Sequence, residues 1–455
     1  MGRVSAAIDI NALLDRGEWT AYQKYLTVLA AIAVIFDGFD IQILGFAIPS
    51  LVREWGIARS AFAPVLALGL AGMSAGSPFA GYYGDRYGRR PALIGCLTLF
   101  GLATIATAFV HSVAALAVFR FLTGIGAGGA LPNASALVAE FAPVRRRAAA
   151  VKLTIICVPL GGMLGGFIAA HVLPLWGWRA LYGIGGTLPL VFACLLWAVL
   201  PESPRFLAQR SSAWPYLRLL LARMGRAVPD GSAFENRTER LAGMGRTGIR
   251  ELLQSPLRHD TVGLWIAFFF CMSAVYLVFG WLPAMLTAQG LNIASASQGL
   301  AVHNLGGVFG VLLWAGLVTW LGSRSPLLWG ALATAGSALA VLLVPVQMHG
   351  GRTLLLLALG VNGLLINAVQ TSMYALAAHV YPTAVRASGV AFAAAIGRVG
   401  AIISSLLGAA IIGAGAGAYW GTLAAAMVCA FAGLAWVRNH YPALGRDPSK
   451  NVSAP

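Results

Sequence analysis

Long apolar stretches alternate with short polar ones along most of the chain. A helix needs about 20 consecutive apolar residues to cross the hydrocarbon core of a bilayer, and twelve stretches come near that length. The pattern therefore predicts twelve transmembrane helices, six on each side of one long polar segment. Their expected bounds are 25–51, 61–83, 91–110, 113–139, 148–172, 178–200, 260–287, 296–320, 326–346, 352–378, 384–413 and 417–437.

Composition agrees with this pattern, because 59% of the 455 residues are apolar and only 10% are charged. Soluble domains carry about 25% charged residues. We therefore expect an all-α, multi-pass membrane protein. The five cysteines lie inside apolar runs without a C-x-x-C pair, so no zinc site or disulfide framework is indicated. We expect no metal and no cofactor.

The positive charges predict the orientation. With the N-terminus in the cytoplasm, 25 of the 31 Lys and Arg residues fall in cytoplasmic segments and four in outward loops. This asymmetry is the positive-inside signal, so the net charge of +16 does not require a nucleic-acid partner. The expected regions are a cytoplasmic N-terminus (1–24), a six-helix bundle (25–200), a cytoplasmic central loop (201–259), a second bundle (260–437) and a cytoplasmic tail (438–455).

Two carboxylates lie in the middle of the first apolar stretch, in "AVIFDGFDIQILGF" (33–46). Asp37 and Asp40 are three residues apart and share one face of a helix. Burying charge in a membrane is costly, so we expect both acids to carry a transported proton and Asp40 also to contact the substrate. Because no acid occurs between Asp260 and Asp447, any carboxylate that takes up a transported proton must belong to the first half. The alternative is permanent pairing with an arginine, or a lining for water.

Two arginines also fall inside apolar stretches. Arg398 is the one deep cation of the second half, and the flanking Gly397 and Gly400 are expected to leave room around it. Its guanidinium matches a carboxylate bidentately, so we expect contact with an anionic substrate, or a salt bridge to the helix 1 acids. Arg120 lies in the fourth expected helix (113–139). It is expected to face the first helix (25–51) and to modulate the acidity of Asp37 and Asp40.

Several polar or aromatic side chains are further candidates for the wall of a substrate cavity, although each could equally serve helix packing. They are Tyr276, Trp281, His303, Asn304, Asn362, Asn367, Gln370 and Tyr374. The run "GGMLGG" (161–166) predicts close helix packing, since it lacks the Lys-Ser/Thr ending of a phosphate loop.

The turn "GYYGDRYGRRP" (81–91) predicts a charge lock on the cytoplasmic side. Asp85 is expected to dock at the positive N-terminus of helix 11, near 383–388. The arginines of this turn are expected to reach Glu140. The expected members of this lock are Gly84, Asp85, Arg86, Gly88, Arg89, Arg90 and Glu140.

These motifs resemble the major facilitator superfamily: "GDRYGRRP" its helix 2–3 signature, "RFLTGIGAGG" its helix 4 motif, and "LPESPRFL" a motif found after helix 6. "DGFD", "GWLPAMLTAQG" and "YPTAVRASGVAFAAAIGRVGAI" resemble its aromatic acid/proton symporters in particular. The resemblance implies uptake of a small aromatic carboxylate with protons across a bacterial inner membrane by a monomer. It also implies that Asp37 and Asp40 are the paired helix 1 acids, and that Arg398 is the helix 11 arginine.

One departure and three rivals qualify this interpretation. The turn "WLGSRSPL" between helices 8 and 9 has no acid, so the lock is expected to be one-sided. Proton-coupled efflux or uptake of another organic anion or drug is the first alternative, and drug efflux is disfavoured because Pro159 precedes Gly161 and Gly162. A sugar porter would present amides and aromatics rather than a deep arginine. A receptor would need a signalling domain, and no nucleophile–base pair indicates an enzyme.

Overall fold

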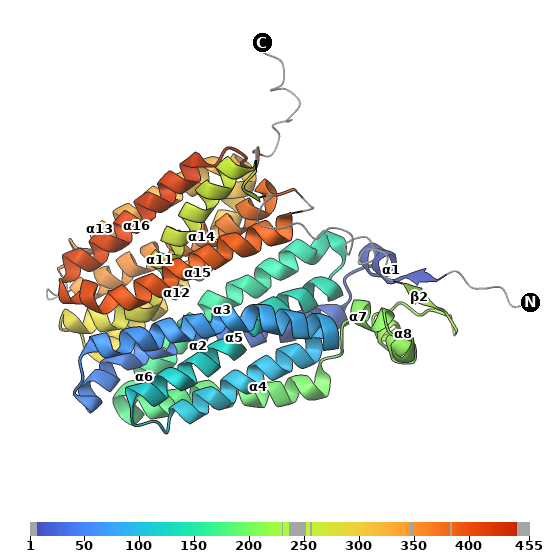
Figure 1. Cartoon of the computed structure of the whole chain (residues 1–455), viewed down its shortest axis with the longest axis horizontal. Helices are drawn as coiled ribbons and strands as arrows, with labels where there is room; N and C mark the ends of the chain where they lie inside the picture. Colours follow the sequence, from blue (N-terminus) through green and yellow to red (C-terminus); the bar gives the residue numbers. More distant parts are fainter. Residues whose placement is uncertain are drawn as a thin grey trace, which may run out of the picture. The chain divides into compact units, whose positions relative to one another are not determined.

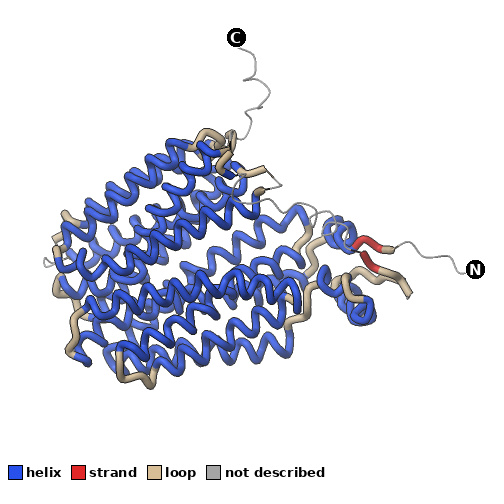
Figure 2. The backbone as a smooth tube through the Cα atoms, viewed as in Figure 1, coloured by secondary structure: helices blue, strands red, loops and turns tan. Residues whose placement is uncertain are grey.

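The structure, a computed structural model, describes residues 7–229, 231–235, 252–254, 257–345, 350–382 and 385–443. Most of this part is helix, and its two strands are two residues long (Figure 2). Ten helical segments within it are long and apolar enough to cross a membrane. The expectation of a mostly helical membrane protein is confirmed.

The elements follow the apolar stretches in order (Figure 1). The first half contains β1 (Ile8–Asp9), α1 (Ile10–Arg16), α2 (Ala21–Trp55), η1 (Arg59–Phe62), α3 (Ala63–Tyr87), α4 (Arg89–Thr107), α5 (Val113–Phe141) and α6 (Val144–Val199). The central segment contains α7 (Pro204–Ala208), η2 (Ser211–Ala213), α8 (Trp214–Arg223) and β2 (Phe234–Glu235). The second half contains α11 (Arg258–Ala288), α12 (Ile293–Leu321), α13 (Arg324–Val341), α14 (Gly351–Val380), α15 (Arg386–Gly413) and α16 (Ala416–Trp436).

Two of these elements explain why ten segments, rather than twelve, meet the criteria for a span. α6 has 56 residues and kinks at Gly177, whose φ of +71° is a left-handed conformation that glycine adopts at little cost. Its two arms match the separate stretches expected at 148–172 and 178–200. α13 has 18 residues, begins at the charged Arg324 and is not among the ten.

The segment expected as a polar loop, 201–259, is partly folded. α8 buries Leu217, Leu220 and Leu221, which lie on one side of the helix. β2 pairs in parallel with β1, so that Ile8 faces Phe234. The central segment and the N-terminus therefore form one small substructure, in which α1, α8 and β2 gather (Figure 1).

The chain divides into two compact units whose borders fall inside helices. Unit 1 comprises Met1–Ile41, Ala71–Gly161 and Tyr182–Arg246. Unit 2 comprises Gln42–Leu70, Gly162–Leu181 and Thr247–Pro455. Unit 2 thus combines parts of α2, α3 and α6 with the second half of the chain. We call the end of unit 2 that carries Arg53 the Arg53 end.

Candidate functional site

Asp37 and Asp40, the acids of the first expected membrane helix, lie on α2 in unit 1. Both are buried, with Asp37 1% and Asp40 3% exposed. The Asp40 Oδ1 accepts hydrogen bonds from Thr104 Oγ1 at 3.1 Å and from Arg120 Nη1 at 3.2 Å. Arg120 Nη2 also donates to the backbone oxygen of Asp40 at 3.2 Å. One carboxylate therefore joins α2, α4 and α5 through a buried ion pair.

Such a pair is sensitive to the loss of either partner, because removing one charge leaves the other buried, at a cost of about 3–5 kcal/mol. Arg120 faces α2, as the sequence suggested, while its role in coupling stays a prediction. Thr104 was not expected here, and neither was the buried Tyr182, which lies within electrostatic range of Arg120 and Asp40. Nothing in the apolar sequence around Thr104 reveals that it faces Asp40.

Gly38, between the two acids, is the point where α2 and α6 cross in backbone contact. A Cβ at Gly38 would lie 2.0 Å from the backbone oxygen of Val158, and one at Gly161 would lie 2.0 Å from that of Ile35. No side chain fits there without separating the helices. The close packing expected from the glycines is confirmed, and it brings the backbone of α2 between the two acids against that of α6.

Arg398 lies on α15, in unit 2, and is half-buried. Its charge is within electrostatic range of Tyr374 on α14, and Tyr374 is in turn close to Tyr276 on α11. Tyr276, Gln370 and Tyr374 are also half-buried, so all four side chains keep an accessible surface. Gln370 and Tyr374 are four residues apart and share one face of α14.

Packing fixes the aromatic members of this group. Phe268 meets Tyr374 edge to face, with ring centroids 5.0 Å apart, and Gln370 Nε2 lies 3.4 Å from Met272 Sδ. Rings beside a guanidinium and an amide suit a planar anion, because the rings cover its faces while the guanidinium binds its carboxylate. α11, α14 and α15 therefore present one group of side chains that could bind an aromatic acid.

The glycines around Arg398 serve packing, which differs from their expected role of leaving room. A Cβ at Gly400 would lie 2.2 Å from the backbone oxygen of Phe269, and one at Gly397 would lie 2.8 Å from Met272 Cγ. α15 therefore rests directly on α11 on both sides of Arg398. This contact fixes the position of Arg398 relative to α11 and does not leave open space beside it.

The other candidates for the cavity wall are buried inside the helix bundle. The Trp281 indole N–H donates to Ser405 O at 3.0 Å, and the His303 ring lies 6.4 Å from that of Phe279. Asn362 donates to Ser337 Oγ and Asn367 to Gly363 O. The bonds of Trp281 and Asn362 join two helices, while Asn367 bonds within α14, so the role of these residues in substrate binding stays a prediction.

Asn304 forms a reciprocal amide pair with Gln42, inside unit 2. Gln42 Nε2 donates to Asn304 Oδ1 at 3.1 Å, and Asn304 Nδ2 donates to Gln42 Oε1 at 2.7 Å. Both residues are 0% exposed, and a Cβ at Gly162 would lie 2.1 Å from Gln42 Nε2. α2, α6 and α12 therefore meet at a buried, hydrogen-bonded contact, in which Gln42 was not expected.

The residues of the expected charge lock gather in unit 1 where α3 meets α4. Arg89 pairs with Asp85, and its Nε lies 3.6 Å from Glu140 Oε1. Glu202 adds a third carboxylate, whose Oε1 accepts from the backbone N–H of Arg89 at 3.0 Å and of Ser203 at 2.8 Å. The expected reach of an arginine to Glu140 is confirmed, and Glu202 extends the cluster.

The rest of the turn supports this cluster. Gly88 has a φ of +115°, and a Cβ there would lie 2.1 Å from Glu202 Oε2, so the position requires glycine. Arg86 binds the Tyr82 hydroxyl at 3.0 Å. Arg90 donates to Trp197 O and stacks over the Trp197 ring. Gly84 packs against Asn133, where a Cβ would lie 2.3 Å from Oδ1.

Burial raises the pKa of the Glu202 carboxyl above its usual range, although the backbone N–H groups of Ser203, Arg90 and Arg89 oppose the shift. Its motif, "LPESPRFL", was noticed in the sequence only as a family signature. Two of the partners of Glu202, Arg89 and Arg90, lie more than 100 residues away along the chain, so no local pattern could identify them.

The second half has a different arrangement at the corresponding turn. Ser323 donates its N–H to Tyr441 O at 3.1 Å and accepts from Tyr441 N on its hydroxyl at 2.8 Å. Asp260 accepts from the Arg438 N–H at 2.7 Å. The C-terminal segment thus binds the turn that lacks an acid. The expected contact of Asp85 with residues 383–388 stays a prediction, because 383–384 lie outside the described residues.

The sequence model of the Major Facilitator Superfamily matches residues 30–360. The chain belongs to the Major Facilitator Superfamily. It is 36% identical over 85% of its length to a gallate transporter of Pseudomonas putida, and 34% identical over 85% to the 4-hydroxybenzoate transporter PcaK of that species; it covers 85% and 86% of these relatives.

Its fold is similar to that of the inward open xylose transporter XylE from E. coli, with a TM-score of 0.73 at 19% identity over 93% of this chain and 98% of that one. The expected resemblance to the superfamily and to its aromatic acid transporters is confirmed. As a member of the superfamily, the protein is a membrane transporter and not an enzyme.

Proposed function

We propose that this transporter takes up an aromatic carboxylate together with protons across a bacterial inner membrane, by alternating access. In this proposal the chain crosses the membrane twelve times and both termini are cytoplasmic. The buried Asp37 and Asp40, with Arg120 bound to Asp40, carry the proposal. The aromatic acid transporters among its relatives support the choice of substrate.

The ion pair supplies a way to couple a proton to a movement. While Asp40 is ionised, its charge holds Arg120 and ties α5 to α2. Protonation removes one charge of the pair, so the guanidinium loses its counter-ion and the tie between the helices weakens. Asp37, buried on the same face of α2, is the second candidate for the proton.

The half-buried group of unit 2 supplies the substrate site in this proposal. Arg398 binds the carboxylate through two N–H groups, and Tyr276 and Tyr374 pack against the ring. Gln370 is placed to bind a ring hydroxyl. The anion brings one negative charge and the proton one positive charge, so their joint entry moves no net charge when the ratio is one to one.

Uptake into proteoliposomes tests the proposal. The purified protein should accumulate 4-hydroxybenzoate or gallate when the lumen is made alkaline, and should lose this accumulation when a protonophore is added. Asp37→Asn and Asp40→Asn should abolish proton-driven accumulation but still exchange labelled for unlabelled substrate, because exchange needs no net proton transfer. Full gradient-driven uptake by both variants would refute the coupling role, while uptake that ignores the gradient in the parent would refute symport itself.

A further inference from the structure

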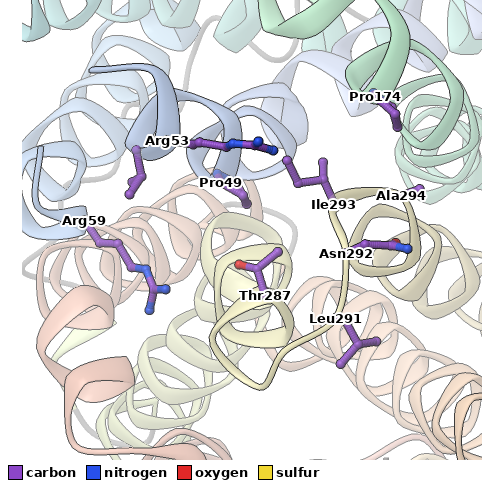
Figure 3. A pocket seen from close by; sticks show the side chains of 10 residues that line it. Pro49, Arg53, Arg59, Pro174, Thr287, Leu291, Asn292, Ile293 and Ala294 are labelled. Carbon is purple, nitrogen blue, oxygen red and sulfur yellow. The ribbon is translucent and has the colours of Figure 1, made fainter. Parts of the chain in front are cut away.

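A cavity of about 500 Å³ opens at the Arg53 end of unit 2, apart from the groups described above (Figure 3). Its volume lies within the range of about 300–1,000 Å³ that is usual for small-molecule sites. It is bordered by the ends of α2, α11 and α12, by η1, and by α6 just before its kink at Gly177. Its lining consists of Pro49, Val52, Arg53, Arg59, Pro174, Thr287, Leu291, Asn292, Ile293 and Ala294.

The charge in this lining is entirely positive. Arg53 and Arg59 contribute guanidinium groups from one side of the cavity, and α12 begins on the other side, next to Asn292 (Figure 3). Neither arginine forms an ion pair with a carboxylate of the described residues. The adjacent Glu54 binds Arg179 and the Trp178 indole instead. The cavity therefore has cationic donors without a local acid.

The rest of the lining is mainly apolar and rigid. Two prolines, Pro49 and Pro174, together with Leu291 and Ile293, offer surface that can cover the face of a ring. The segments expected to face outward hold four arginines and a single acid, Glu54. Cations on that side weaken the positive-inside signal, so the orientation of the chain does not account for them.

The position along α2 connects this cavity with the proton site. Pro49 lies seven residues, about 10 Å, beyond Gln42 on the same helix. Gln42 in turn follows Asp40 by two residues. Along α2, Gln42 therefore lies between the two acids and Pro49.

We propose that this cavity is a collecting site, in which an aromatic carboxylate from outside is held by Arg53 and Arg59 before the Gln42–Asn304 contact opens. The proposal rests on the proposed function, because it takes its substrate class and orientation from it. The carboxylate lies against the guanidinium groups and the ring against the prolines. The site is open to water, so it binds weakly and raises the local concentration of the anion.

Uptake kinetics of the full-length protein test this role. Arg53→Gln/Arg59→Gln should raise the KM for 4-hydroxybenzoate about three- to tenfold at low ionic strength, the scale of two partly screened charges, and leave kcat unchanged. The difference in KM between the parent and this double variant should shrink in high salt. Arg53→Lys/Arg59→Lys should retain most of the affinity. Arg352→Gln is the matched control, since Arg352 is exposed, binds Gln298 and does not line the cavity.

A second measurement needs no transport. Thr287→Cys, in a Cys194→Ser background that removes the exposed native thiol, should react faster with a sulfonate than with a trimethylammonium thiol reagent. This preference should disappear in Arg53→Gln/Arg59→Gln. An unchanged preference or an unchanged KM overturns the collecting site. A parent protein that transports no aromatic acid, yet shows the sulfonate preference, overturns the proposed substrate and leaves the anion site standing.

Discussion

At the scale of single residues, the charges inside the helices differ in how they are held. Asp40 and Arg120 bind each other and are almost fully buried. Arg398 is half-buried and lies near two tyrosines, in a half that has no acid between Asp260 and Asp447. A paired charge is suited to switching, because a proton can break the pair. An accessible cation among aromatic side chains is suited to binding an anion.

Replacement of Arg398 should weaken substrate binding. Arg398→Lys keeps the charge but loses the bidentate guanidinium. Binding of 4-hydroxybenzoate should therefore weaken by about 1–3 kcal/mol. Arg398→Ala should lose more. Calorimetry on the purified protein measures both, with 4-hydroxybenzamide as a neutral analogue that should bind poorly to the parent.

Arg352→Ala is the matched control for this experiment, because it removes an exposed arginine elsewhere in unit 2. If Arg398→Ala binds the acid as tightly as the parent, the carboxylate is held by another cation. Arg120 would then be the next residue to replace.

At the scale of elements, glycines decide where helices touch. Gly38 and Gly161 bring α2 and α6 into backbone contact, and Gly400 does the same for α15 and α11. Gly162 makes room for the Gln42–Asn304 amide pair. Each contact is close and buried, so a helix cannot shift there without breaking it. In the proposed collecting mechanism, the amide pair separates before substrate enters from the Arg53 end.

Removal of one amide should open this contact. Gln42→Ala leaves the Asn304 amide buried with fewer partners, which costs about 1–3 kcal/mol and favours the separated state. Ser297→Cys reports the change, since Ser297 is 0% exposed and lies seven residues before Asn304 on α12. A membrane-impermeant thiol reagent should react with this cysteine faster in the Gln42→Ala protein than in the parent.

The double variant Gln42→Leu/Asn304→Leu is the control, because two apolar side chains leave no amide unsatisfied. It should restore protection of the cysteine. Equal reactivity in the parent and in Gln42→Ala would show that the amide pair does not hold this end closed.

At the scale of the whole molecule, the compact units do not follow the order of the chain. The borders cut α2, α3 and α6, so parts of the first half belong to the unit that holds the second half. The positive charges do follow the order of the chain, because most of them lie in the segments that are expected to be cytoplasmic. This asymmetry predicts that the central segment and the Arg53 end lie on opposite sides of the membrane.

Labelling in intact cells tests this orientation. In a Cys194→Ser background, Ser60→Cys should react with an impermeant maleimide added outside, because Ser60 is exposed at the Arg53 end. Ser211→Cys, exposed in the central segment, should react only after the membrane is permeabilised. The reverse pattern would invert the topology and remove the outward collecting site with it.

Local sequence patterns were sufficient to predict most of the membrane helices. The expected bounds of the first helix, 25–51, lie within α2, and the last stretch, 417–437, differs from α16 by one residue at each end. This success follows from the physics of the bilayer, which demands long apolar helices whatever their neighbours are. The interruption at Gly177 was also visible, as a gap between two apolar runs. The folded parts of the central segment were missed, because short helices leave only a weak pattern.

The sequence by itself determined which polar residues enter the apolar helices, because each one breaks a strongly apolar pattern and is expensive there. Only the tertiary structure decided which partner each one meets. Thr104, Tyr182, Gln42 and Glu202 joined the candidate sites through contacts between segments that lie far apart in the chain. Depth in a membrane depends on position along one helix, which a local pattern records. Contact depends on the rotation and crossing of several helices, which is set by packing at sites such as Gly38 and Gly162.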